Sequence, residues 1–189
     1  MHSSIDTPSQ ETLLKMLCEN LETVGWYMRS TYVAEHIKLN KHNPNYLSSA
    51  ELHPNQLILS NNINKTVENY DILVFAIPSA FLSSELRKLT TPLTDKVVFS
   101  AIKGIVPESG LIVGEHFFKN YNTPYNNIGV ITGPCHAEEV AMERLSYLTI
   151  ACQDQDQAKK VGECLKSRYI RVKISDDIIG TEYAAMLKN

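Results

Sequence analysis

The chain has 189 residues, of which 43% are hydrophobic and 21% charged, so it can build the core of one domain and wholesale disorder is excluded. Its 18 basic and 21 acidic residues give a net charge of −3, which argues against a general nucleic-acid binder with a basic face. No apolar run reaches the roughly 18 residues of a membrane span, and the amino terminus has no secretory signal pattern. We therefore expect a cytoplasmic protein.

Helical and strand-like hydrophobic patterns alternate along the chain. Strands are predicted at residues 23–28, 57–60, 72–77, 96–101, 128–132, 147–152 and 169–174. Helices are predicted at 11–20, 32–39, 63–69, 79–89, 111–121, from the Gly133-Pro134 turn to about Met142, at 154–167, and from a Ser175 or Asp176 cap to Asn189. This alternation predicts an α/β fold with a doubly wound, mostly parallel sheet whose ligands lie at the carboxyl ends of the strands.

The cysteines and histidines do not form a pattern typical of a metal site. The four cysteines lack C-x-x-C spacing, and the six histidines are dispersed. Cys135 and His136 are adjacent, but neighbouring side chains on a helix point about 100° apart. We therefore predict no metal, no disulfide framework and no cysteine-protease dyad.

Three segments that follow predicted strands or open helices carry candidate chemistry. In the first, Lys103 and Gly104 end a strand, where a lysine can face solvent or offer its ammonium to a phosphate or oxyanion. In the second, Gly133 and Cys135 lie at a strand–helix junction, which is either an ordinary junction or an anion-binding helix start. In the third, Lys188 ends the last helix, where a lysine is also favoured by the helix dipole.

Together these segments resemble the bacterial NAD(P)-dependent glycerol-3-phosphate dehydrogenases. The matching motifs are K-G at 103–104, G-P-C-H-A-E-E at 133–139 and L-K-N at 187–189, with N-P-N-Y-L at 43–47, A-I-P-S at 76–79 and S-D-D-I-I-G at 175–180. The resemblance covers roughly Thr12 to Asn189 and implies a Rossmann-like fold. It also implies hydride transfer between NADPH or NADH and the dihydroxyacetone phosphate/glycerol 3-phosphate pair, for phospholipid synthesis.

The resemblance also implies roles for particular residues. Lys188 matches the general acid/base, which requires a depressed pKa, and Lys103 matches a second cation that touches both cofactor and substrate. Substrate contacts are further implied for Gly133, Cys135 and Asn189, and cofactor contacts for Ala137, Pro78, Met28 and Arg29. Arg29 follows the 23–28 strand where an NAD-only enzyme places an acid, so it either meets adenine or a 2′-phosphate or is an ordinary surface arginine.

Two departures from the family pattern predict an incomplete enzyme. Residues 1–11 contain no glycine, whereas relatives begin with a central strand and a G-x-G-S loop that cradles the pyrophosphate. The chain also ends at Asn189, before the family's helical substrate domain. We expect residues 1–11 to be a non-homologous segment and 12–189 an incomplete dinucleotide-binding domain, with weak or no turnover. The two strands flanking the missing one are left with unmatched edges, unless they close up against each other.

Two alternatives stay open at this point. The chain is either a non-catalytic nucleotide-binding remnant or a related dehydrogenase with another small substrate. The sequence settles neither cofactor preference nor oligomeric state, and a homodimer is compatible with a full-length form.

Overall fold

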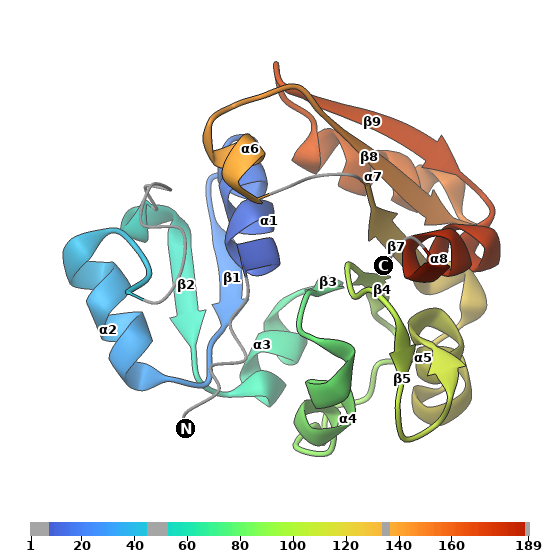
Figure 1. Cartoon of the computed structure of the whole chain (residues 1–189). Coiled ribbons are helices and arrows are strands. Elements are labelled where there is room, and N and C mark those ends of the chain that lie inside the picture. The colour runs from blue at the N-terminus through green and yellow to red at the C-terminus, as the bar shows by residue number, and fades with distance from the viewer. Residues whose placement is uncertain (1–7, 45–52, 134–136, 188–189) are drawn as a thin grey trace.

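The computed structural model describes residues 8–44, 53–133 and 137–187, which form an α/β structure with two separate sheets and a small hairpin (Figure 1). The smaller sheet pairs β1 (Val24–Tyr27) in parallel with β2 (Leu57–Ser60). The larger sheet has the order β3-β4-β7-β8-β9. Its strands are β3 (Ile72–Phe75), β4 (Val97–Ser100), β7 (Ile128–Thr132), β8 (Ser146–Cys152) and β9 (Ile170–Ser175).

The larger sheet is parallel except at one ladder. Strands β3, β4 and β7 run in parallel, β7 and β8 pair antiparallel, and β8 and β9 again pair in parallel. The hairpin joins β5 (Ile105–Val106) to β6 (Leu111–Ile112) and lies between β4 and the next helix. The mostly parallel α/β fold predicted from the sequence is confirmed.

Helices cover both faces of the larger sheet. Asp154 caps α7 by accepting from the N–H groups of Asp156 and Gln157, as the sequence predicts. On β8, Ile150 belongs to the same buried cluster as Val161 of α7, whereas Ala151 packs with Ile178 of α8. Since neighbouring strand residues point to opposite faces, α7 and α8 lie on opposite sides of the sheet. The helices are α1 (Pro8–Cys18), α2 (Thr31–Asn40), α3 (Ile63–Asn69), α4 (Ser79–Leu86), α5 (Val113–Tyr121), α6 (Ala137–Ala141), α7 (Gln155–Leu165) and α8 (Ile178–Leu187).

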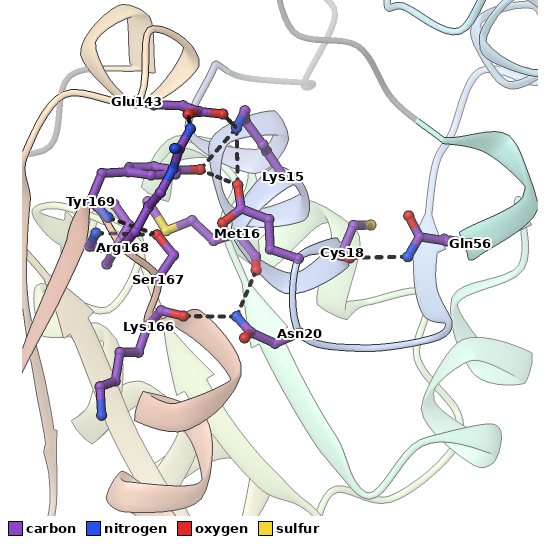
Figure 2. A network of polar contacts seen from close by, with 12 residues as sticks. Lys15, Met16, Cys18, Asn20, Gln56, Glu143, Lys166, Ser167, Arg168 and Tyr169 are labelled. Atoms are coloured by element: carbon purple, nitrogen blue, oxygen red, sulfur yellow. Dashed lines mark hydrogen bonds and ion pairs between the residues drawn. The ribbon is translucent and has the colours of Figure 1, made fainter.

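Helix α1 and the turn after it connect the two sheets, as the polar network in Figure 2 shows. Asn20 donates to the carbonyl oxygens of Met16 (3.3 Å), Cys164 (3.0 Å) and Lys166 (3.0 Å), which fastens the turn to the end of α7. On the other side, Gln56, the residue before β2, donates to the carbonyl oxygen of Cys18 at 3.0 Å, which connects the end of α1 to the smaller sheet. Among the described residues β1 and β3 do not pair, so these side-chain contacts take the place of a shared ladder.

A second group of contacts fixes α1 to the start of β9. Lys15 donates to Glu19 at 3.0 Å and to the hydroxyl of Tyr169 at 2.9 Å, and that hydroxyl donates to Glu19 (Figure 2). Glu143 accepts from Arg168 and lies 3.6 Å from Lys15. The Tyr169 ring itself is buried in the core cluster that contains Met16.

Two details differ from the sequence prediction. The hairpin β5–β6 was not expected, because Leu111 and Ile112 fit the apolar face of the helix that follows them. The cap of α8 is Asp177, whose carboxylate accepts from the N–H of Gly180 at 2.8 Å, and not Ser175 or Asp176. The unmatched edges expected for the flanking strands agree with the structure, since β1 and β3 do not pair among the described residues.

Across the described ranges, none of the helices combines the length and apolar character needed to cross a bilayer.

Candidate functional site at the carboxyl edge of the sheet

The segments that follow β3 and β4 lie close to each other, at Ser79 after β3 and at Lys103-Gly104 after β4. The two strands are parallel neighbours, so the segments that follow them leave the same edge of the sheet. Gly104 has a φ of +98°, a conformation that L side chains rarely adopt, and a Cβ built on it would lie 3.7 Å from the Ser79 Oγ. The loop after β4 therefore passes beside the start of α4, which follows β3.

A buried serine shapes the exit from β4 toward Lys103. The Ser100 side chain is buried and its Oγ accepts from the N–H of Ile102 at 3.2 Å. Ile102 is itself buried, and Lys103, the next residue, is exposed. This turn leaves Lys103 exposed just beyond the end of β4, and an exposed ammonium can interact with an anionic group.

Pro78 precedes the first residue of α4 at the same edge. It takes the N-cap position without a side-chain hydrogen bond to the helix. Its carbonyl oxygen accepts from the N–H of Phe81 at 2.9 Å. The N–H groups of Ser79 and Ala80, which precede that bond, are of the kind suited to an anionic or polar ligand. Pro78 and Lys103 are thus brought to one edge of the sheet, the edge at which the sequence predicts that ligands lie.

Arg29 is held by a buried carboxylate. Its Nη1 lies 3.6 Å from the Oε1 of Glu85, whose side chain is only 5% exposed. The same carboxylate accepts from Lys88 Nζ at 2.8 Å and from the Tyr27 hydroxyl at 3.0 Å. Burial, followed by this contact with Glu85, raises the pKa of Tyr27 to about 12.

Glu85 is a residue that sequence reasoning did not single out. It lies on α4, 56 positions after Arg29, and neither periodicity nor spacing relates the two. Met28, the residue before Arg29, is fully buried and its N–H donates to the Ser60 carbonyl at 2.8 Å. Met28 therefore packs in the smaller sheet, while Arg29 lies at the end of β1 beside α4.

Gly133 is required by the backbone around it. A Cβ on this residue would lie 2.1 Å from the carbonyl oxygen of Tyr147, in the antiparallel β8. Gly133 therefore permits the close approach of β8 just beyond the end of β7. Ala137 is the first residue of α6, while Cys135, Lys188 and Asn189 lie outside the described residues.

Two features of the described residues fit a dinucleotide, and one feature expected for its pyrophosphate is not found. The start of α4, which has no side-chain cap, suits a polar group of the ligand, and Arg29 suits its adenosine end. A glycine-rich loop that would cradle the pyrophosphate is not found before β1, since the first glycine of the chain is Gly25, inside that strand.

Comparison with known proteins supports the same assignment. Residues 11–158 match the family model described as NAD-dependent glycerol-3-phosphate dehydrogenase N-terminus. A glycerol-3-phosphate dehydrogenase [NAD(P)+] of Lysinibacillus sphaericus is 34% identical over 180 residues, which is 94% of this chain and 53% of the relative. One from an Exiguobacterium strain is 33% identical over 176 residues, 92% of this chain and 51% of the relative. The chain thus spans about half the length of the curated relatives it matches.

Solved structures share the fold. The glycerol-3-phosphate dehydrogenase of Plasmodium falciparum superposes with a TM-score of 0.83 at 21% identity, over 98% of this chain and 54% of that one. The enzyme of Coxiella burnetii superposes with a TM-score of 0.81 at 19% identity, over 95% of this chain and 55% of that one. With the family match over residues 11–158, the chain belongs to the NAD-dependent glycerol-3-phosphate dehydrogenase family and corresponds to its N-terminal domain.

Proposed function

We propose that this domain serves the interconversion of dihydroxyacetone phosphate and glycerol 3-phosphate with NADH or NADPH. The observation that carries the proposal is the meeting of Lys103-Gly104 with the start of α4 at one sheet edge, in a chain of this family. A reduced nicotinamide supplies a hydride when bound. The residues of this chain then have to bind the substrate and manage its charge and its proton.

Lys103 is proposed to stabilise charge on the substrate oxygen. Reduction of the ketone at C2 forms a C–H bond and breaks the carbonyl π bond, which places negative charge on the oxygen. An ammonium beside that oxygen is worth more in the transition state than in the ground state, so it accelerates the step. Lys188 is proposed to donate the proton that completes the alcohol, and to remove it in the reverse direction.

The other matched positions are proposed to contact the two ligands. Gly133, Cys135 and Asn189 contact the substrate, and Ala137, Pro78, Met28 and Arg29 contact the cofactor. Support from the structure differs among them. Pro78 lies at the carboxyl edge of the larger sheet, and Arg29 follows β1 and contacts Glu85 in the last turn of α4, whereas Met28 is buried in the smaller sheet. Only the backbone of Met28 is suited to such a contact.

We also propose that the chain of 189 residues turns over slowly or not at all, because it has no glycine-rich loop before β1. The test is NADH and NADPH oxidation with dihydroxyacetone phosphate at stoichiometric protein. We expect a rate far below that of a full-length relative, which Lys103→Ala lowers further by about 100-fold or more. Lys159→Ala, which removes an exposed lysine of α7, is the matched control and leaves the rate unchanged.

Two outcomes would contradict parts of this proposal. A rate near that of a full-length relative contradicts the proposal that this chain is an impaired enzyme. Reduction of phosphate-free ketones faster than dihydroxyacetone phosphate indicates a related dehydrogenase with another substrate. Calorimetric titration with both cofactors separates the remaining alternative: binding without turnover indicates a nucleotide-binding module, and no binding indicates a remnant.

A further inference from the structure

The proposed reaction needs two amines at one carbonyl group, and these amines come from distant parts of the chain. Lys103 lies just after β4, and Lys188, 85 positions later, follows Leu187 at the end of α8. Groups that act together on one substrate have to be held in a fixed relation, and a displacement of about 1 Å can cost a large part of the rate. The contacts that fix α8 to the segment after β4 therefore bear on the chemistry.

The hairpin β5–β6 brings the start of α5 back to the segment that carries Lys103. In this antiparallel pair Ile105 lies opposite Ile112. Lys103 is two residues before Ile105, and Gly114 is two residues after Ile112. The first turn of α5 is therefore connected to Lys103 by a short paired segment and not only through the eleven-residue course of the chain.

Glu182 of α8 reaches the same turn of α5, the helix beside it in Figure 1. Its two carboxylate oxygens accept from the N–H of Gly114 at 3.2 and 3.1 Å. Ile112, the N-cap residue of α5, makes no side-chain hydrogen bond to the helix, so a side chain of α8 supplies the acceptor instead. Gly114 permits this approach, since a Cβ on it would lie 2.9 Å from the Oε2 of Glu182.

The carboxylate of Glu182 is an expensive way to pack α8 against α5. The residue is 6% exposed, and within the described ranges no cation forms an ion pair with it. Burial raises the pKa of Glu182 to about 7, and the nearby Glu115 acts in the same direction. An apolar side chain of similar size would avoid this cost. A directed hydrogen bond, unlike apolar packing, also fixes the rotation and the height of α8 against α5.

We propose that Glu182 is a positioning residue, which holds α8 so that Lys188 meets the substrate beside Lys103. The connection runs from Lys103 through the β5–β6 hairpin to Gly114, and from Gly114 through Glu182 into α8. This inference rests on the proposed function, because it takes the roles of the two lysines from there.

The first test is cross-linking with difluorodinitrobenzene, which joins two amines only where they lie a few ångströms apart. Mass spectrometry of the digested chain should find Lys103 joined to Lys188. Glu182→Leu fills the same space but has no acceptor for Gly114, so the yield of this cross-link should fall about fivefold or more. Glu182→Gln keeps an acceptor oxygen and should retain the yield of the parent chain. Glu163→Leu, the same change at an exposed site of α7, is the matched control and leaves the yield unchanged.

Single-site adducts of Lys103 and Lys188 make the outcomes distinguishable, because they show that each amine reacts without reporting the distance between them. If both adducts form in the parent chain and the cross-link does not, the amines do not converge, which overturns the proposed function and this inference with it. If the parent chain and Glu182→Leu are cross-linked equally, the proposed function stands and the positioning role is overturned. Equal loss in Glu182→Gln and Glu182→Leu also overturns the role, since the hydrogen bond is then not what matters.

The second test follows the Gly114 amide by hydrogen exchange. This amide should exchange about tenfold faster or more in Glu182→Leu than in the parent chain, and at the parent's rate in Glu182→Gln. The amides of α7 are the internal control and should keep their rates in all three proteins. Unchanged protection of Gly114 in Glu182→Leu shows that the carboxylate does not hold the start of α5, and this result overturns the inference.

A second variant replaces Glu182→Leu if that protein does not fold, as judged by circular dichroism. In Gly114→Ala the added Cβ would lie 2.9 Å from the Oε2 of Glu182, so the carboxylate has to move while its charge remains. The yield of the cross-link between Lys103 and Lys188 should then fall about twofold or more. The parent's yield in Gly114→Ala overturns the positioning role.

Discussion

Gly133 serves the strand pairing of the larger sheet before it serves any ligand. Its missing side chain is what lets the Tyr147 carbonyl approach, and a backbone oxygen cannot rotate out of the way as a side chain can. One residue therefore combines this packing role with the substrate contact implied by the family resemblance. When Gly133 is substituted, an effect on activity has to be separated from an effect on stability.

We predict that Gly133→Ala destabilises the fold by about 1–3 kcal/mol, because β8 must shift away from residue 133. Urea unfolding followed by circular dichroism measures the change. Gly110→Ala is a useful comparison: a Cβ there meets nothing within 4 Å, but its φ of +65° is unfavourable for alanine. Equal stability of Gly133→Ala and the parent chain would show that β8 is not held at this distance.

Glu85 accepts hydrogen bonds from Lys88 and Tyr27 and forms an ion pair with Arg29, so its charge acts directly on the Tyr27 hydroxyl. We predict that Glu85→Gln lowers the pKa of Tyr27 from about 12 toward its ordinary value, although burial keeps it raised in part. Ultraviolet titration of tyrosinate measures this, with Tyr27→Phe in both backgrounds to assign the signal among nine tyrosines. An unchanged titration would mean that burial alone sets this pKa.

At the scale of the elements, Glu182 joins α8 to the start of α5. It is almost fully buried, and its two carboxylate oxygens accept from the N–H of Gly114 at 3.2 and 3.1 Å. Burial raises the pKa of Glu182 to about 7, while the backbone N–H groups of Gly114 and Val113 act in the opposite direction. The folded state therefore holds this proton more tightly than the unfolded chain.

The sign of the pH dependence follows from that difference. Below about pH 4.5 both states are protonated and the contribution of Glu182 to stability is complete. Between pH 4.5 and about 7 the folded state binds more protons, so stability falls as pH rises, by at most about 1.4 kcal/mol per pH unit.

We predict that Glu182→Gln removes this part of the pH dependence and is more stable than the parent chain at pH 8. The amide is neutral at every pH and its oxygen still accepts from Gly114. Denaturant unfolding from pH 4 to 8 measures the slope, and Glu163→Gln, an exposed residue of α7, is the control. A variant with the parent's slope in this range would refute the assignment to Glu182.

The turn after α1 owes its position to one amide side chain. We predict that Asn20→Ala lowers the free energy of unfolding by about 1–2 kcal/mol, because the carbonyl groups of Cys164 and Lys166 lose their donor. Asn40→Ala is the matched control, since Asn40 donates only to the His36 carbonyl one helical turn before it. Equal effects of the two substitutions would show that Asn20 does not connect separate elements.

At the scale of the whole molecule, local patterns predict elements and not their directions. The bounds of β2, α3 and β7 agree with the sequence because strong apolar periods end at turn residues there. The antiparallel direction of β8 was not predicted, since it depends on the route of the chain after Gly133. The hairpin β5–β6 has only two residues in each strand, too few for a period.

The candidate site shows the same division. The positions of Lys103 and Pro78 at the carboxyl edge follow from the strands that precede them and from the family motifs. The contact between Arg29 and Glu85 depends on how the smaller sheet lies against α4, which no local pattern encodes. The unmatched edges of β1 and β3, in contrast, were predicted, because the resemblance implies a strand between them.

The contacts of α1 also bear on the order in which the chain acquires structure during synthesis. Lys15 bonds Tyr169, 154 positions later, and the apolar face of α1 packs in the cluster that contains that ring. At roughly 5–20 residues per second, the ribosome needs on the order of ten to thirty seconds to make the intervening chain. Until then the nascent α1 lacks the Tyr169 ring against its apolar face, so a chaperone has this interval in which to bind Leu13 and Met16.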